Sequence, residues 1–206
     1  MIFYYNPDGI GDVLITYLKD GDEPKIEEKG PIVRISDRAS GEVLGYNFFN
    51  VTRLLSFVLE KGMNRPNQTL IDRLNQELTE AGFQDRLPKE NEPLIVTGYV
   101  KKMKKHPDSD HMHVCQVDIG REELQIVCGA PNIDEGQKVV VARVGALMPD
   151  GMIIRPTVLR GVASDGMICS ARELGLPGAP KRRGILILDP GTEAGEDFLS
   201  LRDQKD

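Results

Sequence analysis

Short apolar runs alternate with turn residues over the first fifty positions of the chain. Four of these runs are rich in Ile, Val, Tyr and Phe, and turn signals such as Asp20-Gly21 and Ser40-Gly41 separate them. Runs of this length and composition, bounded by turn residues, are typical of β-strands. The sequence therefore predicts four strands, at residues 2–5, 13–18, 31–35 and 43–49.

After residue 49 the apolar positions recur with the period of an amphipathic helix. The first predicted helix begins at Asn50 and ends at Gly62, with an apolar stripe of Leu54, Leu55, Val58 and Leu59. The second begins at Asn67 and ends at Gly82, with a stripe of Leu70, Ile71, Leu74, Leu78 and Ala81. Asn is a favoured N-cap and Gly a favoured helix terminator. We therefore predict a small α+β domain at residues 1–88.

After residue 93 the sequence pattern is again typical of β-strands. Residues 85–93 contain two prolines and mixed charges, which predicts a linker. Five strands are expected beyond it, at residues 95–103, 112–118, 124–127, 139–144 and 185–188. Short strands with Gly-rich turns are typical of a small all-β barrel, which we place at residues 93–190. Ser170 and Glu173 have the spacing of a capping box, which predicts one helical turn, and residues 191–206 are expected to form an acidic C-terminal tail.

Charge is distributed unevenly along this chain of net charge −6. Residues 1–93 hold 11 Lys and Arg against 16 Asp and Glu, a net of −5, and residues 189–206 hold 2 against 6, a net of −4. Residues 94–188 hold 13 against 10, a net of +3. Phosphate recognition depends on local positive potential and not on the charge of the whole chain, so the barrel region can bind RNA.

Cellular location is suggested by what the sequence lacks. The N-terminus has no basic start followed by a long apolar stretch, and no apolar run approaches the ~20 residues that span a bilayer. The three cysteines, Cys115, Cys128 and Cys169, form no Cys-x-x-Cys pair. We expect a cytoplasmic protein with reduced thiols and no contact with a membrane.

Several separate sequence blocks in the barrel region occur in a recognisable order. They lie at residues 105–110 (KHPDSD), 114–118, 124–132, 135–139, 159–162, 164–171 and 173–176. Over about 95 residues, nearly half of the chain, this order resembles the tRNA-binding module of bacterial phenylalanyl-tRNA synthetase β subunits, methionyl-tRNA synthetases and endothelial-monocyte-activating-polypeptide-like proteins. The resemblance implies an OB fold for this region and tRNA as its class of ligand.

The whole chain resembles the stand-alone, YtpR type of this module, in which a domain of unknown function precedes it and no synthetase core is attached. Lys101, Lys102 and Lys104 depart from the family, because apolar or acidic residues are common at these positions. The first barrel strand is therefore more basic than usual.

Candidate RNA contacts come from the basic residues and from the block around Ser164. On a regular strand Lys102 and Lys104 share one face, and Lys101 and Lys105 share the other. The Ser164 hydroxyl can bond a phosphate or a base edge, and Met167 offers a soft apolar surface to a base. The predicted RNA-binding residues are Lys102, Lys105, Asn132, Arg155, Arg160, Ser164, Met167 and Arg172.

Each candidate also has a structural interpretation. The lysines can form a solvated strand face, and Arg160 and Arg172 can pair with Asp165 or Glu173. Asn132 can cap a turn, and Met167 can lie in the barrel core next to a turn at Gly166. Aromatic residues are scarce in this half of the chain, with Tyr99 and Phe198 only, so it cannot stack a series of bases. This composition favours a structured RNA read by shape and phosphates.

Other functional classes fit the sequence less well. The three His and three Cys residues have no zinc-finger spacing, and Val162 occupies the position where a nucleophile elbow needs Gly. We predict a non-catalytic tRNA-binding protein that uses no metal and no cofactor. The alternative is a protein-binding or chaperone-like use of the same OB fold. The acidic N-terminal domain could dock on an aminoacyl-tRNA synthetase or another protein, and a homodimer is possible.

Overall fold

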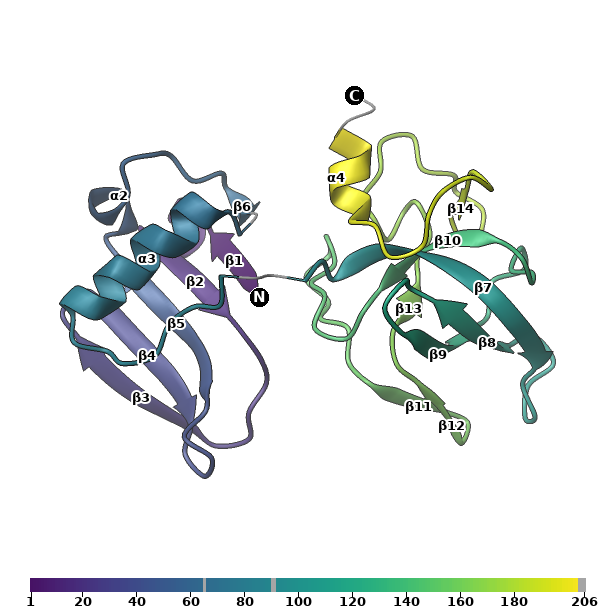
Figure 1. Cartoon of the computed structure of the whole chain (residues 1–206), viewed down its shortest axis with the longest axis horizontal. Helices are drawn as coiled ribbons and strands as arrows, with labels where there is room; N and C mark the ends of the chain where they lie inside the picture. Colours follow the sequence, from purple (N-terminus) through teal and green to yellow (C-terminus); the bar gives the residue numbers. More distant parts are fainter. Residues whose placement is uncertain (65, 90–91, 204–206) are drawn as a thin grey trace. The chain divides into compact units, whose positions relative to one another are not determined.

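The computed structural model describes residues 1–64, 66–89 and 92–203 and divides into two compact units, Met1–Glu92 and Pro93–Asp206 (Figure 1). Each unit is built on its own antiparallel sheet. Among the described residues, no helix is both long enough and apolar enough to cross a membrane.

The N-terminal unit contains a six-stranded antiparallel sheet in the order β3-β4-β5-β2-β1-β6. The strands are β1 (Ile2–Tyr5), β2 (Val13–Tyr17), β3 (Pro24–Lys29), β4 (Ile32–Asp37), β5 (Val43–Phe49) and β6 (Gly62–Asn64). The four predicted strands are confirmed. The two strands that the pattern did not predict are the edge strands, β3 with four charged residues and β6 with three residues in all.

Helix α3 (Gln68–Glu80) lies across one face of this sheet (Figure 1). The Asn67 side chain caps it by accepting a hydrogen bond from the Leu70 amide at 2.9 Å, and Gly82 takes a positive φ of 78° just beyond its end. Its buried stripe packs with the sheet in one core, which includes Phe3, Leu14, Tyr46, Phe48, Leu70, Ile71, Leu74 and Leu78. The second predicted helix is thus confirmed.

The first predicted helix is wrong beyond its first turn. Of the predicted segment at residues 50–62, only α2 (Val51–Leu54) is helical, and Asn50 has a left-handed backbone and makes no side-chain cap. The unit also contains the short helix α1 (Pro7–Ile10). Leu55 leaves the helix in an extended conformation and is buried in the core, while Arg73 of α3 donates to the freed Leu54 carbonyl at 2.7 Å. Tertiary packing therefore overrides the helical period, and Val58 is 94% exposed.

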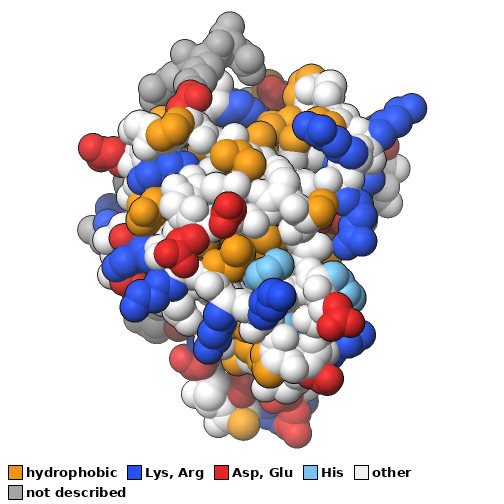
Figure 2. All heavy atoms as spheres, turned by 90° about the vertical axis from the view of Figure 1, so that its right-hand side faces the viewer, with side chains coloured by type: hydrophobic (Ala, Val, Ile, Leu, Met, Phe, Trp, Pro, Cys, Tyr) orange, Lys and Arg blue, Asp and Glu red, His pale blue; other side chains and the backbone are white. Residues whose placement is uncertain are grey.

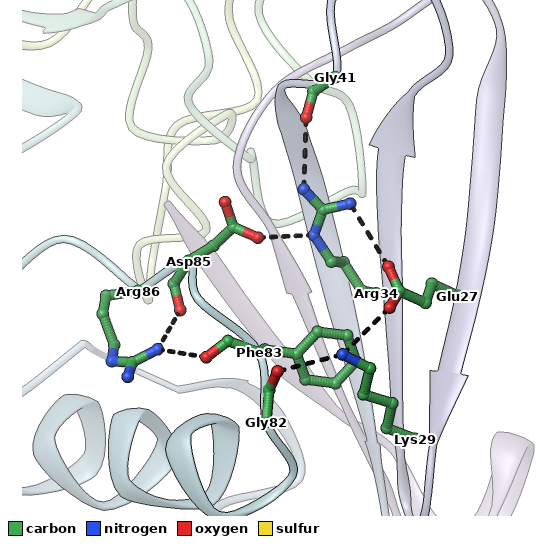
Figure 3. A network of polar contacts seen from close by, with 8 residues as sticks. All are labelled: Glu27, Lys29, Arg34, Gly41, Gly82, Phe83, Asp85 and Arg86. Carbon is green, nitrogen blue, oxygen red and sulfur yellow. Dashed lines mark hydrogen bonds and ion pairs between the residues drawn. The ribbon is translucent and has the colours of Figure 1, made fainter.

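A polar network ties the segment after α3 to the sheet (Figure 3). Arg34 of β4 pairs with Asp85 at 2.8 Å, and Lys29 of β3 donates to the Gly82 carbonyl at 3.1 Å. Leu87 is buried, and the Asn75 side chain bonds both its N–H and its C=O. The predicted linker at residues 85–93 is therefore too long, since residues 85–87 belong to the N-terminal unit; residues 90–91 lie outside the described residues.

The C-terminal unit has a sheet in the order β13-β10-β7-β8-β9, with β14 also paired to β10. A separate hairpin is formed by β11 and β12. The strands are β7 (Ile95–Lys105), β8 (His113–Asp118), β9 (Glu123–Cys128), β10 (Lys138–Ala142), β11 (Thr157–Leu159), β12 (Val162–Ser164), β13 (Met167–Ile168) and β14 (Ile187–Leu188). The five predicted strands are confirmed, whereas the hairpin and β13 were not predicted. Strand pairing leaves the sheet open between β13 and β9, so it does not confirm a closed barrel.

Residues 191–203, part of the predicted acidic tail, pack against the C-terminal unit. Thr97 of β7 donates to the Glu193 carbonyl at 2.6 Å, and its own amide donates to the Glu196 carbonyl at 2.9 Å. Helix α4 (Phe198–Asp203) follows, with Phe198 buried in a core beside Ile95 and Val140. The apolar Phe198 and Leu199 outweigh the surrounding charges; the last three residues of the predicted tail, 204–206, lie outside the described residues.

Candidate nucleic-acid interface

The second half of β7 presents a basic face to solvent. A bulge between Val100 and Lys102 shifts the register, so that Val100 and Met103 both pack toward the same core. Lys102 and Lys104 therefore point outward together, opposite Gln116 and Val114 of β8. Lys105 is also exposed, and within the described residues none of these three lysines has an ion-pair partner. Lys101 differs, because it pairs with Glu123.

The β11–β12 hairpin places Arg160 beside the end of β7. Arg160 forms the turn with Gly161, and both have positive φ values, 45° and 82°. The Arg160 guanidinium donates to the Asp108 carbonyl at 2.9 Å, so it lies against the connection between β7 and β8. Arg155 is exposed in the segment that enters the hairpin. The structure thus brings Arg160 toward the basic end of β7, from far away in sequence.

His106 holds this arrangement together. It is only 4% exposed, and its Nδ1 accepts a hydrogen bond from the Asp108 amide at 3.1 Å. Its Nε2 must then carry the proton that bonds the Leu159 carbonyl at 3.0 Å. From the sequence, His106 was a candidate only for metal binding. Its positioning role depends on a contact across 53 positions that no local pattern reveals.

Ser164 occupies a buried position instead of an RNA-facing one. It is 2% exposed, its Oγ accepts a hydrogen bond from the Val127 amide at 3.0 Å, and it lies 3.3 Å from the Gly166 carbonyl, to which it donates. The hydroxyl is therefore used inside the protein, and we do not retain Ser164 among the direct RNA contacts.

Replacement of Ser164 by Ala should destabilise the C-terminal unit by about 1–3 kcal/mol, because the Val127 amide would lose its buried acceptor. Chemical unfolding of the full chain, followed at β9, measures this loss. We expect the tRNA affinity of the folded variant to change less than twofold; a large loss of affinity without a loss of stability would return Ser164 to the interface.

Three other candidates meet in a cleft of about 600 Å³ at the end of β9. Asn132, Met167 and Arg172 line it, together with Arg182 and Arg183. The Asn132 amide is occupied by two hydrogen bonds to the Ile185 backbone, at 3.0 and 2.8 Å, which favours its structural interpretation. Met167 is partly buried against a core, whereas Arg172 is exposed on the turn that the predicted Ser170–Glu173 capping box forms.

The predicted residues thus form two groups. Lys102 and Lys105 lie on β7, Arg160 lies in the hairpin and Arg155 lies in the segment that enters it, whereas Asn132, Met167 and Arg172 line the cleft. Val127 connects the groups, since it lines the cleft and bonds Ser164 at the end of the hairpin. Figure 2 shows Lys and Arg side chains around neutral and apolar surface on a face where histidines are also visible. All three histidines of the chain, His106, His111 and His113, lie at the β7–β8 connection, which therefore belongs to this face.

The thiols of this unit have little chemical reactivity. Burial raises the pKa of Cys115 and of Cys169 to about 12, and it also raises the pKa of Cys128. All three therefore stay protonated at neutral pH, and a protonated thiol is a poor nucleophile and metal ligand. Within the described residues, His, Cys, Asp and Glu form no group of three that could hold a metal ion.

Comparison with known families covers both units. Residues 95–197 match the family described as "Putative tRNA binding domain", and residues 19–90 match a domain of unknown function, DUF4479. The chain is 45% identical over 197 residues to "Putative tRNA-binding protein YtpR" of Bacillus subtilis (strain 168), an alignment that covers 95% of this chain and 98% of that protein.

Part of the chain is also similar to phenylalanine–tRNA ligase β subunits. Identity is 48% over 118 residues with the subunit of Staphylococcus haemolyticus (strain JCSC1435), covering 53% of this chain and 15% of the subunit. It is 57% over 95 residues with that of Sulfurimonas denitrificans, covering 46% and 12%. The chain spans only a small part of these subunits but nearly all of YtpR. It therefore belongs to the tRNA-binding protein family that includes YtpR of Bacillus subtilis.

Proposed function

We propose that this protein binds tRNA through its C-terminal unit and catalyses no reaction. Family membership supports the ligand class. The observation that carries the proposal is the alignment of exposed cations on β7 with Arg160 of the hairpin, where Lys102, Lys104 and Lys105 have no acidic partner among the described residues. Unpaired lysines keep their full charge for phosphate groups.

The C-terminal unit is best interpreted as an OB-type barrel that closes through irregular hydrogen bonds. The Asp165 amide donates to the Gln125 carbonyl at 2.9 Å, and the Val127 amide donates to the Ser164 hydroxyl. These contacts connect the residues before β13 with β9, the two ends of the sheet order. OB barrels bind oligonucleotides through their loops between strands 1 and 2 and strands 4 and 5. In this proposal the β7–β8 connection and the β11–β12 hairpin correspond to these two loops.

Recognition should depend on phosphates and tRNA shape. Tyr99 and Phe198 are the only aromatic residues after residue 93, and Phe198 is buried. A protein without stacking aromatics binds unstructured strands poorly, whereas a folded RNA presents closely spaced phosphates to a basic surface. We place this activity in the cytoplasm, where tRNA is charged and used, with an aminoacyl-tRNA synthetase or another tRNA-handling protein as a possible partner of the N-terminal unit.

Replacing Arg160 by Gly tests the proposal at its central residue. Gly adopts the positive φ of this turn without strain, so the variant removes the guanidinium and keeps the hairpin. We expect about tenfold weaker tRNA binding, or about 1.4 kcal/mol, from the loss of a charge-assisted phosphate contact. Fluorescence anisotropy with labelled tRNA measures the affinity.

The matched control is Lys25→Ala, which removes the same single charge from β3 of the N-terminal unit. It should change tRNA affinity less than twofold. Equal losses in the two variants would show that only net charge matters, and an unchanged affinity in Arg160→Gly would place the RNA contacts away from the hairpin.

A further inference from the structure

The cleft at the end of β9 is assembled from parts of the chain that lie far apart in sequence. Its lining comes from three segments, within residues 127–132, 167–173 and 180–186. The Asn132 side chain holds the third segment against the first, because it donates to the Ile185 carbonyl at 3.0 Å and accepts from the Ile185 amide at 2.8 Å. Gly184 packs so closely here that an added Cβ would lie 2.9 Å from Asn132 Oδ1. The fold therefore determines the positions of the cleft walls.

Three arginine side chains of this cleft have no acidic partner among the described residues. Arg172, Arg182 and Arg183 are all exposed, and within the part of the chain that the structure describes none of them forms an ion pair or a side-chain hydrogen bond. Glu173 is the one carboxylate among the lining residues, and it accepts hydrogen bonds from both the amide and the hydroxyl of Ser170 at 2.7 Å. The cleft therefore has positive charge available for an anion, and guanidinium groups match phosphate in geometry.

Part of the cleft lining is apolar. Val127, Pro131 and Met167 lie in the same cleft as the arginines, and none of the lining residues is aromatic. A guanidinium plane can replace an aromatic ring as the surface on which an unpaired base stacks, and a methionine thioether packs well against rings. An apolar surface next to phosphate-binding groups is what a single nucleotide requires.

The size of the cleft restricts what can enter it. Its volume of about 600 Å³ lies within the range of about 300–1,000 Å³ that is usual for sites of small ligands. One nucleotide fits such a volume, whereas a base pair in a stacked helix does not. Only an unpaired nucleotide can turn its base out of the stack and present it to Met167 and Arg172.

The cleft continues the surface that carries the exposed lysines. Lys104 of β7 pairs with Val114 of β8, which pairs with Val127 of β9, so the three side chains lie in one row on the same face of the sheet. Neighbouring strands are ~4.8 Å apart, which places the Val127 edge of the cleft roughly 10 Å from Lys104. A nucleotide close to a phosphate bound by Lys104 can therefore reach the cleft.

We propose that the cleft binds one unpaired nucleotide of the RNA, with the base against Met167 and the phosphate on the arginines. The inference rests on the proposed tRNA binding and adds a second contact of different chemistry. Paired regions bind through their phosphates on β7 and the hairpin, and a neighbouring unpaired nucleotide enters the cleft. A site for one base agrees with the scarcity of aromatic residues, because it does not require a series of stacked bases.

Binding of RNA duplexes to the full chain tests the proposal. A blunt duplex is compared by fluorescence anisotropy with the same duplex carrying single-stranded 3′ or 5′ extensions. We expect the better extension to strengthen binding about tenfold, as for one stacked base, and Arg172→Ala and Arg183→Ala should each reduce this gain to about twofold or less. The matched control is Lys181→Ala, which removes a charge from the same segment outside the cleft lining and should keep the gain. Because the gain is a ratio of two affinities of one variant, a general effect of lost charge cancels.

Equal binding of blunt and extended duplexes by the unmodified protein would overturn the role of the cleft and leave the proposed tRNA binding intact. A gain that both arginine variants keep would also overturn it, whereas failure of every duplex to bind would contradict the proposed function as well. Circular dichroism checks that the variants remain folded.

The unmodified chain provides an independent measurement. The NMR signal of the Met167 methyl group is followed during titration with adenosine 5′-monophosphate and, separately, with inorganic phosphate. We expect a saturable shift that requires several times less nucleotide than phosphate, because only the nucleotide brings a base to Met167. An equal response to both compounds would show a site for anions alone and would overturn the proposal, as would no response to either.

Discussion

Raising the salt concentration from about 50 to about 200 mM should weaken tRNA binding by about a hundredfold. If Lys102, Lys104, Lys105 and Arg160 each neutralise one phosphate, about four counterions are released, and log K falls with log salt at a slope of about −3.6. All four side chains are exposed on β7 or the hairpin. Titration of labelled tRNA at several salt concentrations measures the slope.

The same titration on Lys102→Ala should give a slope shallower by about one, with uniformly weaker binding. Lys101→Ala is the comparison, since Lys101 is already paired with Glu123 and should contribute less. A slope near zero for the unmodified protein would contradict phosphate recognition, and equal slopes in the two variants would contradict the assignment of Lys102.

Replacement of Gly166 by Ala should destabilise the C-terminal unit by about 3 kcal/mol. Gly166 has a φ of 145°, a conformation that costs a non-glycine residue about 1–3 kcal/mol. An added Cβ would also lie 2.9 Å from the Ala142 carbonyl oxygen and 3.4 Å from Ile126 Cδ1. β13 begins at the next residue and pairs with β10, and the preceding Asp165 amide bonds the Gln125 carbonyl of β9. The substitution therefore disturbs both contacts of this segment with the sheet.

Gly161→Ala separates the two causes of this loss. Gly161 also has a positive φ, 82°, but an added Cβ would meet no atom within 4 Å. Its cost should be about 1 kcal/mol, from backbone conformation alone. Chemical unfolding of the full chain, followed by NMR at amides of β9 and β10, compares the variants. Equal costs would show that the contact with Ala142 is unimportant.

Local patterns predicted those elements whose own residues determine them. The Asn67 cap, the buried stripe of α3 and Gly82 all follow from short-range rules, and the structure has each of them. The Ser170–Glu173 capping box is another such case. Lys102 and Lys104 lie on one face of β7, as predicted for a regular strand. The β-bulge at Lys101 does not change this, because both residues follow it.

Long-range contacts account for what the patterns missed. The residues of β3 are mostly charged and do not by themselves predict a strand. The segment is a strand because it pairs with β4. Helix α2 ends before Leu55, because Leu55 is buried in the core with an extended backbone. Ser164 stands in a block that resembles an RNA-binding loop, but its hydroxyl faces Val127, 37 residues earlier. Burial and bonding of this kind depend on which segments meet, which no local spacing encodes.

A competition experiment tests the central claim most directly. Labelled tRNA bound to the full chain would be challenged with unlabelled tRNA or with single-stranded RNA of equal length, at one low salt concentration. If the cations of β7 and the hairpin recognise a folded RNA, tRNA should compete at least tenfold better than the single strand. Equal competition by both RNAs, or no binding of tRNA at all, would contradict tRNA recognition by the C-terminal unit.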